Sequence, residues 1–249
     1  DWHAALGVLG LADAVVTHTR ADAAYLARLT RAPVTVAGWA GLTASADAGP
    51  PPEPVRELAV RLRAASFSVL VVGNLTAYKG LPAVVRDFAV HTRDARLLIA
   101  GPSRDDTLTG EIRSVARAVG SRIQLYPHRV PPEHVHHLYR VADAALCPYR
   151  IDGPWEFFTK VLFPGTVATA LAFGTPVIAP DLPAITEMAA GHPARLYPAA
   201  LGPGSALAAA EAAPPTGSLP TADGTARWRT VTATYQQMFN QFTQPTCPG

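Results

Sequence analysis

Six short apolar runs recur along the middle of the chain, separated by segments that read as helices. The runs lie at residues 68–73, 95–101, 122–126, 142–148, 175–180 and 194–198. Strands that are apolar along their whole length are typical of a sheet covered on both faces, as parallel sheets are. This pattern constrains the fold more than any other feature of the sequence.

Helices are expected between these runs, at residues 81–91, 107–119, 131–141, 165–173 and 183–190. Alternation of about six strands with helices predicts an α/β fold, a Rossmann-like doubly wound parallel sheet. Hydrophobic residues make up 49% of the 249 residues, enough to bury a substantial core.

The flanks of this repeat differ from it. Residues 12–19 and 32–38 read as strands around a helix at 20–30, and the Pro-rich stretch 45–54 reads as a linker. We therefore predict a remnant of an N-terminal α/β domain and a linker at 1–45, a Rossmann-like domain at 46–225, and a closing helix and tail at 226–249. The apolar stripe of that closing helix is expected to pack against the protein.

Charge and composition exclude several classes. The net charge is +2 without Lys/Arg runs, so we expect no nucleic-acid partner. No apolar run approaches the roughly 20 residues of a transmembrane helix. Cys147 and Cys247 show no metal-ligand spacing, so no metal site is expected. We expect a cytoplasmic protein, with peripheral attachment at the inner membrane face as the alternative.

The stretch VGNLTAYKG, residues 72–80, lies where a predicted strand ends and a helix begins. In doubly wound sheets, ligands bind beyond the carboxyl ends of the strands, and a lysine beside a helix N-terminus can meet a diphosphate. Taken alone, Lys79 is more often a solvated surface residue. The stretch matches neither of the common glycine-rich phosphate motifs.

A second candidate lies in FPGTVATALAFGTPVIAP, residues 163–180. Gly165 and Thr166 begin a predicted helix there, which offers free N–H groups and a hydroxyl to an anion. The alternative is that Thr166 only caps the helix. Two such turns at strand ends of one sheet indicate a phosphate site more strongly than either does alone.

The order of four segments resembles the C-terminal, donor-binding domain of GT-B glycosyltransferases, particularly family 4. The segments are VGNLTAYKGLPAVVRDFA, ARLLIAGPS, VPPEHVHHLYRVADAALCPY and ALAFGTPVIAPDLPAITEM, and together they cover roughly residues 68–188. The YKG and PYR signatures, at 78–80 and 148–150, are most similar to bacterial members of the polysaccharide type.

This resemblance implies a hexosyltransferase-type enzyme, metal-independent, retaining and without a cofactor, whose donor is a nucleoside-diphosphate sugar. Its acceptor would be a glycan, a lipid-linked sugar or a small molecule. Lys79 would hold the donor diphosphate and the Gly165–Thr166 turn its distal phosphate, while residues 128–130 would pack on the nucleobase. The expected site residues are Gly73, Asn74, Lys79, Gly80, His128, Arg129, Val130, Arg150, Gly165, Thr166 and Thr169, with Lys79 and Arg150 in the catalytic role.

The sequence departs from the family pattern at three positions. Asn74 stands where many members carry an arginine, so Arg150 is expected to supply that charge, with Lys160 as the second candidate. The paired glutamates that usually hold the sugar and ribose are replaced by Val161 and Thr169. Glu156 lies nearby, but at the wrong spacing.

Length leaves a second interpretation open. A complete GT-B enzyme has two Rossmann-like domains, and this chain shows one and a remnant, so activity alone could be incomplete and a partner chain could supply the other domain. The alternative function is a non-catalytic GT-B subunit, and a sugar-nucleotide epimerase ranks last. His134, His136 and His137 are expected to be surface residues, and no histidine, His18 included, is nominated as a base.

Overall fold

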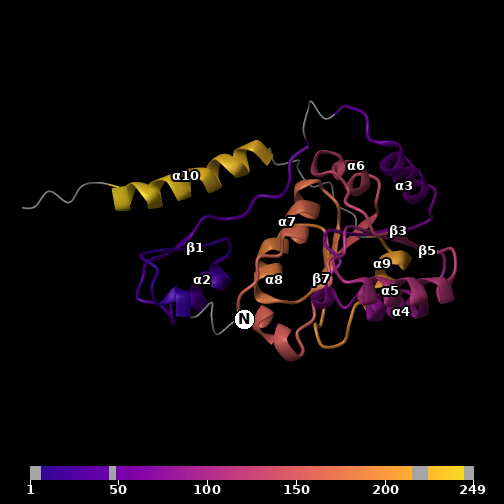
Figure 1. Ribbon diagram of the computed structural model, residues 1–249, viewed down its shortest axis with the longest axis horizontal. Helices are drawn as coiled ribbons and strands as arrows, with labels where there is room; N and C mark the ends of the chain where they lie inside the picture. Colours follow the sequence, from indigo (N-terminus) through magenta and orange to yellow (C-terminus); the bar gives the residue numbers. More distant parts are fainter. Residues whose placement is uncertain (1–6, 45–48, 215–223, 244–249) are drawn as a thin grey trace, which may run out of the picture.

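A computed structural model describes residues 7–44, 49–214 and 224–243 (Figure 1). The main sheet consists of β3 (Ser68–Val72), β4 (Arg96–Ala100), β5 (Ile123–Tyr126), β6 (Ala144–Leu146), β7 (Val177–Pro180) and β8 (Ala194–Tyr197). Its strand order is β5-β4-β3-β6-β7-β8, and every neighbouring pair is parallel. This is the predicted six-stranded doubly wound sheet.

The buried strands alternate between two cores, as side chains of a strand point to opposite faces. Val69 and Val71 of β3 lie in one core, whereas Leu70 lies in the other. The helices of the first face are α4 (Leu81–His91), α5 (Asp106–Val119) and α9 (Gly204–Ala212). Those of the second are α3 (Glu53–Arg63), α6 (His136–Tyr139), α7 (Gly165–Ala172) and α8 (Pro183–Ala189). Covering helices on both faces explain why these strands carry so few polar residues.

Two helical predictions need correction. The stretch 131–141 is the short 3-10 turn η2 (Pro132–His134) followed by the single-turn α6, because Pro131 and Pro132 lack amide donors and delay the helix. The helix α3 begins at Glu53, inside the predicted linker 45–54, and was not predicted. Its buried residues Val55, Leu58 and Leu62 lie on one face and pack against α6.

The N-terminal residues form a separate small unit. It comprises β1 (Val15–Thr17), α2 (Arg20–Leu26) and β2 (Val34–Val36), in which the two strands pair in parallel. Glu187 of α8 joins this unit to the larger one by accepting hydrogen bonds from the backbone N–H groups of Arg20 and Ala21, both at 2.9 Å. Its carboxylate therefore caps the start of α2, where helix N–H groups lack partners.

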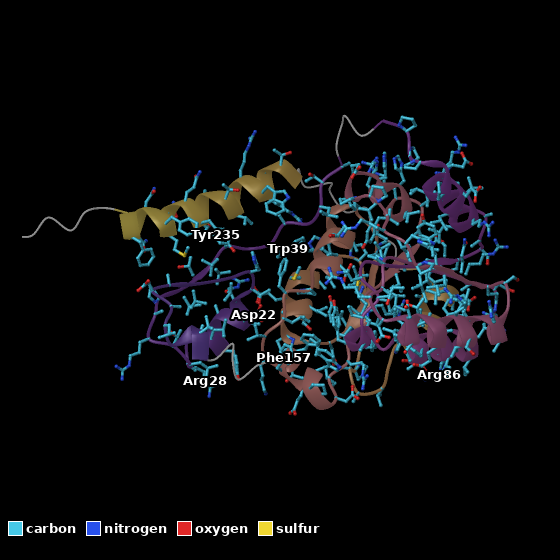
Figure 2. The ribbon with its side chains drawn as sticks, viewed as in Figure 1. Asp22, Arg28, Trp39, Arg86, Phe157 and Tyr235 are labelled. Carbon is cyan, nitrogen blue, oxygen red and sulfur yellow. The ribbon has the colours of Figure 1, made fainter. Side chains whose placement is uncertain are left out.

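The long helix α10 (Gly224–Thr243) runs across the N-terminal unit rather than over the main sheet (Figure 1). Trp228 donates its indole N–H to the carbonyl of Gly41 at 3.0 Å, and Arg227 lies 4.3 Å over the Trp39 ring. In Figure 2, Trp39 lies between α10 and the main domain. The start of α10 is thus fastened to the segment that connects the two units.

The rest of α10 packs only in part, although its apolar stripe was expected to pack against the protein. Val231 is buried, whereas Phe239 and Phe242 are about half exposed. Within the described ranges, no helix is sufficiently long and apolar to cross a membrane.

Candidate functional site

The strand order reverses between β3 and β6, so the loops that follow these strands separate and leave a crevice at the carboxyl edge of the sheet. In open α/β sheets, ligands bind at this reversal point. The loop after β3 leads through the 3-10 turn η1 (Ala77–Lys79) into α4, and the loop after β6 carries residues 147–152. The N–H of Arg150 donates to the carbonyl of Tyr78 at 2.7 Å and ties the two loops together.

Three of the predicted residues meet at one point of this crevice. Gly73 has a φ of +107°, and a Cβ there would lie 3.4 Å from Lys79 Nζ and 3.5 Å from Thr166 Cγ2. The end of β3, the lysine and the first turn of α7 are therefore mutual neighbours. Gly73 leaves this junction free of a side chain.

Lys79 is buried, with 3% of its surface exposed. Its Nζ donates to the Val72 carbonyl at 3.3 Å, and no described carboxylate lies within ion-pair distance of it. Burial lowers the pKa of Lys79 to about 8. A buried ammonium with a single carbonyl partner is costly unless an anion joins it.

The first turn of α7 faces the same junction. Gly165 opens the helix after Pro164 and donates its own N–H to the Phe163 carbonyl at 3.0 Å, whereas the N–H groups of Thr166 and Val167 have no partner within the helix. The hydroxyls of Thr166 and Tyr149 lie 3.1 Å apart, and Thr169 donates to the Gly165 carbonyl at 2.8 Å. This arrangement presents helix N–H groups and partial positive charge beside Lys79.

These residues open into a cavity of about 550 Å³, here called the Lys79 cavity. The size falls in the range usual for small-molecule sites. Its lining residues are Leu42, Val72, Gly73, Asn74, Tyr78, Lys79, Val135, Tyr139, Tyr149, Phe157, Phe158, Val161, Leu162, Phe163, Gly165, Thr166 and Thr169. The structure thus brings Gly73, Asn74, Lys79, Gly165, Thr166 and Thr169 of the expected set into one cavity.

Aromatic residues form much of the lining and were not predicted as part of the site. This aromatic wall consists of Tyr78, Tyr149, Phe157, Phe158 and Phe163. Tyr78 stacks on Tyr149 with ring centroids 5.8 Å apart, and Phe158 meets both rings edge-on. Phe157 and Phe158 come from the 3-10 turn η3 (Gly153–Thr159), and Figure 2 shows Phe157 on the side that faces α2. The sequence signal was the aromatic run WEFF at 155–158.

Arg150 does not join Lys79 in this cavity. Its guanidinium is partly exposed and pairs with Asp152, two residues along the chain. This hydrogen bond raises the pKa of Arg150. Arg150 and Gly80 line a second cavity, of about 680 Å³, between α4 and the loop after β8. Lys79 lines both cavities and lies between them.

The predicted nucleobase loop lies apart from both cavities. His128 and Arg129 are exposed, whereas Val130 is buried in the core shared with α6 and α7. His128 packs edge-on against Tyr126, with centroids 5.1 Å apart. The role of residues 128–130 in binding the nucleobase therefore stays a prediction from the family resemblance.

The two positions that lack glutamates both line the Lys79 cavity. Val161 presents an apolar side chain there, and the hydroxyl of Thr169 is engaged within α7. Glu156 and Lys160 are exposed on and after η3, and neither lines the cavity. The residues that the structure describes contain no group of three His, Cys, Asp or Glu side chains arranged to hold a metal ion.

The expectation that the three neighbouring histidines are surface residues is wrong for His134 and His136, whereas His137 is half-buried. His134 and His136 are buried, because η2 and α6 turn them under α3 rather than outward. The rings of His136 and His137 lie 3.9 Å apart. The segment that carries these histidines borders the Lys79 cavity, because Val135 and Tyr139 line that cavity.

Comparison with known proteins completes this description. Residues 66–212, more than half of the chain, match the family described as "Glycosyl transferases group 1". No curated protein sequence matches the chain.

Solved structures share the fold. Sucrose-phosphate synthase from Thermosynechococcus elongatus has a TM-score of 0.70 at 20% identity, covering 96% of this chain and 61% of that one. Anabaena Alr3699/HepE, solved with UDP and glucose, has a TM-score of 0.63 at 15% identity, covering 97% and 66%. The E. coli trehalose-6-phosphate protein bound with UDP-2-fluoro glucose has a TM-score of 0.61 at 16% identity, covering 100% and 64%. The chain thus has a GT-B, Rossmann-like fold and spans about three fifths of the length of these structures.

Proposed function

This chain belongs to the glycosyl transferases group 1 family, and from that premise we propose that it is the donor-binding part of a hexosyltransferase. It transfers a sugar from a nucleoside-diphosphate sugar to an acceptor hydroxyl, with retention at the anomeric carbon. The acceptor is a glycan, a lipid-linked sugar or a small molecule. We place the reaction in the cytoplasm or at the inner membrane face.

The observation that carries this proposal is the burial of Lys79 without a carboxylate partner, beside the first turn of α7. A donor diphosphate gains negative charge as its bond to the sugar breaks. The ammonium and the helix N–H groups are fixed before the reaction, so they stabilise that charge without reorganising. We propose that this electrostatic stabilisation replaces a metal ion.

Thermal unfolding with UDP, GDP, ADP and dTDP tests the proposal. A ligand at a hundred times its Kd stabilises a protein by about 2.7 kcal/mol, which raises Tm by several degrees for a chain of this size. We expect one diphosphate to raise Tm in the wild type but not in Lys79→Ala. Lys160→Ala is the matched control, because Lys160 is the only other lysine and is exposed. An equal rise of Tm in the wild type and in Lys79→Ala would show that Lys79 does not bind the diphosphate.

A second candidate function is a non-catalytic subunit that partners a separate acceptor-binding chain. It is favoured by the lack of acidic side chains among the residues lining the Lys79 cavity. In that case none of the diphosphates changes Tm in any variant. The two candidates therefore give opposite results in one experiment.

A further inference from the structure

The Lys79 cavity is polar at one end and apolar over most of its remaining surface. Lys79, Asn74 and Thr166 mark the polar end, next to the α7 N-terminus. The rest of the lining is mostly apolar and consists of the aromatic wall together with Leu42, Val72, Val135, Tyr139, Val161 and Leu162, with hydroxyls only on its tyrosines. A ligand that fills the cavity thus needs an anionic end and an apolar body.

The described residues that line this cavity include no aspartate or glutamate. The nearest acid on the N-terminal side, Asp22, lies behind the lining and accepts the N–H of Leu162 at 3.1 Å. Asp22 is buried and points from α2 toward the main domain (Figure 2). It fixes the lining segment in place and does not reach a ligand as an acceptor.

Several hydroxyls in the lining are already engaged. The Thr169 hydroxyl donates to the Gly165 carbonyl, and those of Tyr149 and Thr166 pair with each other, which leaves that pair one O–H group to donate to a ligand. A hydroxyl of a bound sugar that enters without a partner loses its hydrogen bonds to water. Each such hydroxyl lowers affinity by roughly fivefold to a hundredfold.

We infer that the donor of this site carries a deoxygenated sugar, a hexose in which one or more hydroxyls are replaced by hydrogen. The inference rests on the proposed function, because the diphosphate anchors the donor at Lys79. The sugar then lies against Val161, Phe158 and Phe163, where a methyl or methylene group packs favourably and a hydroxyl finds no carboxylate acceptor.

The test compares donors that differ only in hydroxyl content. The diphosphate that raises Tm most supplies the base, and Kd is measured by calorimetry for its glucose, 6-deoxyglucose and 4,6-dideoxyglucose derivatives. We expect affinity to rise by at least about fivefold at each step, so that the dideoxy sugar binds at least roughly 25-fold tighter than glucose. Equal or tighter binding of glucose, with the free diphosphate still bound, overturns the inference and leaves the proposed function standing. Absence of binding by any free diphosphate contradicts both.

A substitution tests the same contact from the side of the protein. Val161→Glu places a carboxylate in the cavity, so we expect it to improve glucose binding relative to the dideoxy sugar and to reduce the ratio of their Kd values at least fivefold. Val60→Glu is the matched control, since Val60 is exposed on α3. Circular dichroism and Tm establish that both variants are folded. An unchanged ratio in folded Val161→Glu also contradicts the inference, because a carboxylate there would then not meet the sugar.

Discussion

Lys79 combines two properties that rarely coexist, namely almost complete burial and a side chain without a described carboxylate partner. Burial lowers the pKa of Lys79 to about 8, because the loss of hydration destabilises the charged ammonium more than the neutral amine. An anion bound at the first turn of α7 reverses this cost. If a diphosphate binds here, as proposed, its binding is coupled to protonation of the lysine.

The first prediction concerns the pH dependence of diphosphate affinity. Below about pH 8 the free protein carries the charged lysine, and above it the ammonium is lost. We expect Kd to be constant up to about pH 8 and then to rise, approaching tenfold per pH unit. Calorimetric titration from pH 6.5 to 9.5 measures it. Lys79→Arg keeps its charge over this range, and an unchanged slope in that variant would assign the titration to another group.

Residue types at strand ends could be predicted from the sequence, whereas side-chain directions could not. Gly73, Lys79 and Gly165 follow from turn chemistry and from the position of helix starts. Arg150 was expected beside Lys79, but its side chain turns to Asp152 because an ion pair two residues away is within reach. The aromatic wall was missed because aromatic residues are usually assigned to packing.

At the scale of elements, η2 and α6 bring three histidines, His134, His136 and His137, close together. Burial lowers the pKa of His137, and the nearby charges of His136 and Arg140 lower it further. Burial also lowers the pKa of His136, although its ring N–H donates to the Glu133 carbonyl at 2.9 Å. Protonation of this segment is therefore harder in the folded chain than in the unfolded one.

The second prediction is that the free energy of unfolding declines with acid. Because the folded pKa values lie below the unfolded value of about 6.5, the stability is fully present above that pH and falls as pH decreases below it. Urea unfolding at pH 7.5 and 5.5 measures the loss. We expect His137→Gln to reduce the loss and His128→Gln, at an exposed histidine, to leave it unchanged. Equal losses in all three proteins contradict the role of this segment.

Another element-scale contact joins α9 to the turn before β4. Glu211 accepts hydrogen bonds from the backbone N–H groups of Arg93, Asp94 and Ala95, at distances of 2.7 to 3.1 Å. Burial raises the pKa of Glu211, but the three N–H donors outweigh it, and the net shift is downward. The carboxylate is the acceptor that holds this turn.

The third prediction is that Glu211→Gln lowers the free energy of unfolding by about 1 to 2 kcal/mol, because bonds to a charged acceptor are replaced by weaker neutral ones. Urea unfolding at pH 7.5 measures it. Glu57→Gln, an exposed glutamate on α3, provides the control. If Glu211→Gln lowers the free energy of unfolding no more than Glu57→Gln does, the hydrogen bonds of the Glu211 carboxylate do not stabilise the fold.

The helix boundaries show which parts of the fold could be predicted from the sequence pattern. The bounds of α4 were predicted in full, because Gly80 and Pro82 mark its start and buried residues recur along one face. The helix α3 was missed, since the Pro-rich run before it reads as a loop and only three buried positions reveal its face. The division into domains at 45 and 225 stays a prediction, because these positions border or lie in stretches outside the described residues.

At the scale of the whole molecule, the Lys79 cavity depends on the joint between the two units. Leu42 comes from the segment that connects them, and Leu162 is held by Asp22 of α2. Trp228 fastens α10 to the same connecting segment through Gly41. A displacement of the N-terminal unit would therefore change the shape of the cavity.

The fourth prediction addresses this joint through Glu187, whose carboxylate accepts two backbone N–H groups of α2. We expect Glu187→Ala to speed amide hydrogen exchange in α2 and around Leu162 while leaving β3 and β4 unchanged, because the lost hydrogen bonds are to α2 and α8 packs on β7. Mass spectrometry of exchanged peptides measures it, with Glu57→Ala as the control. Uniformly faster exchange would show that the two units unfold together, and the cavity would then owe its shape to the fold as a whole.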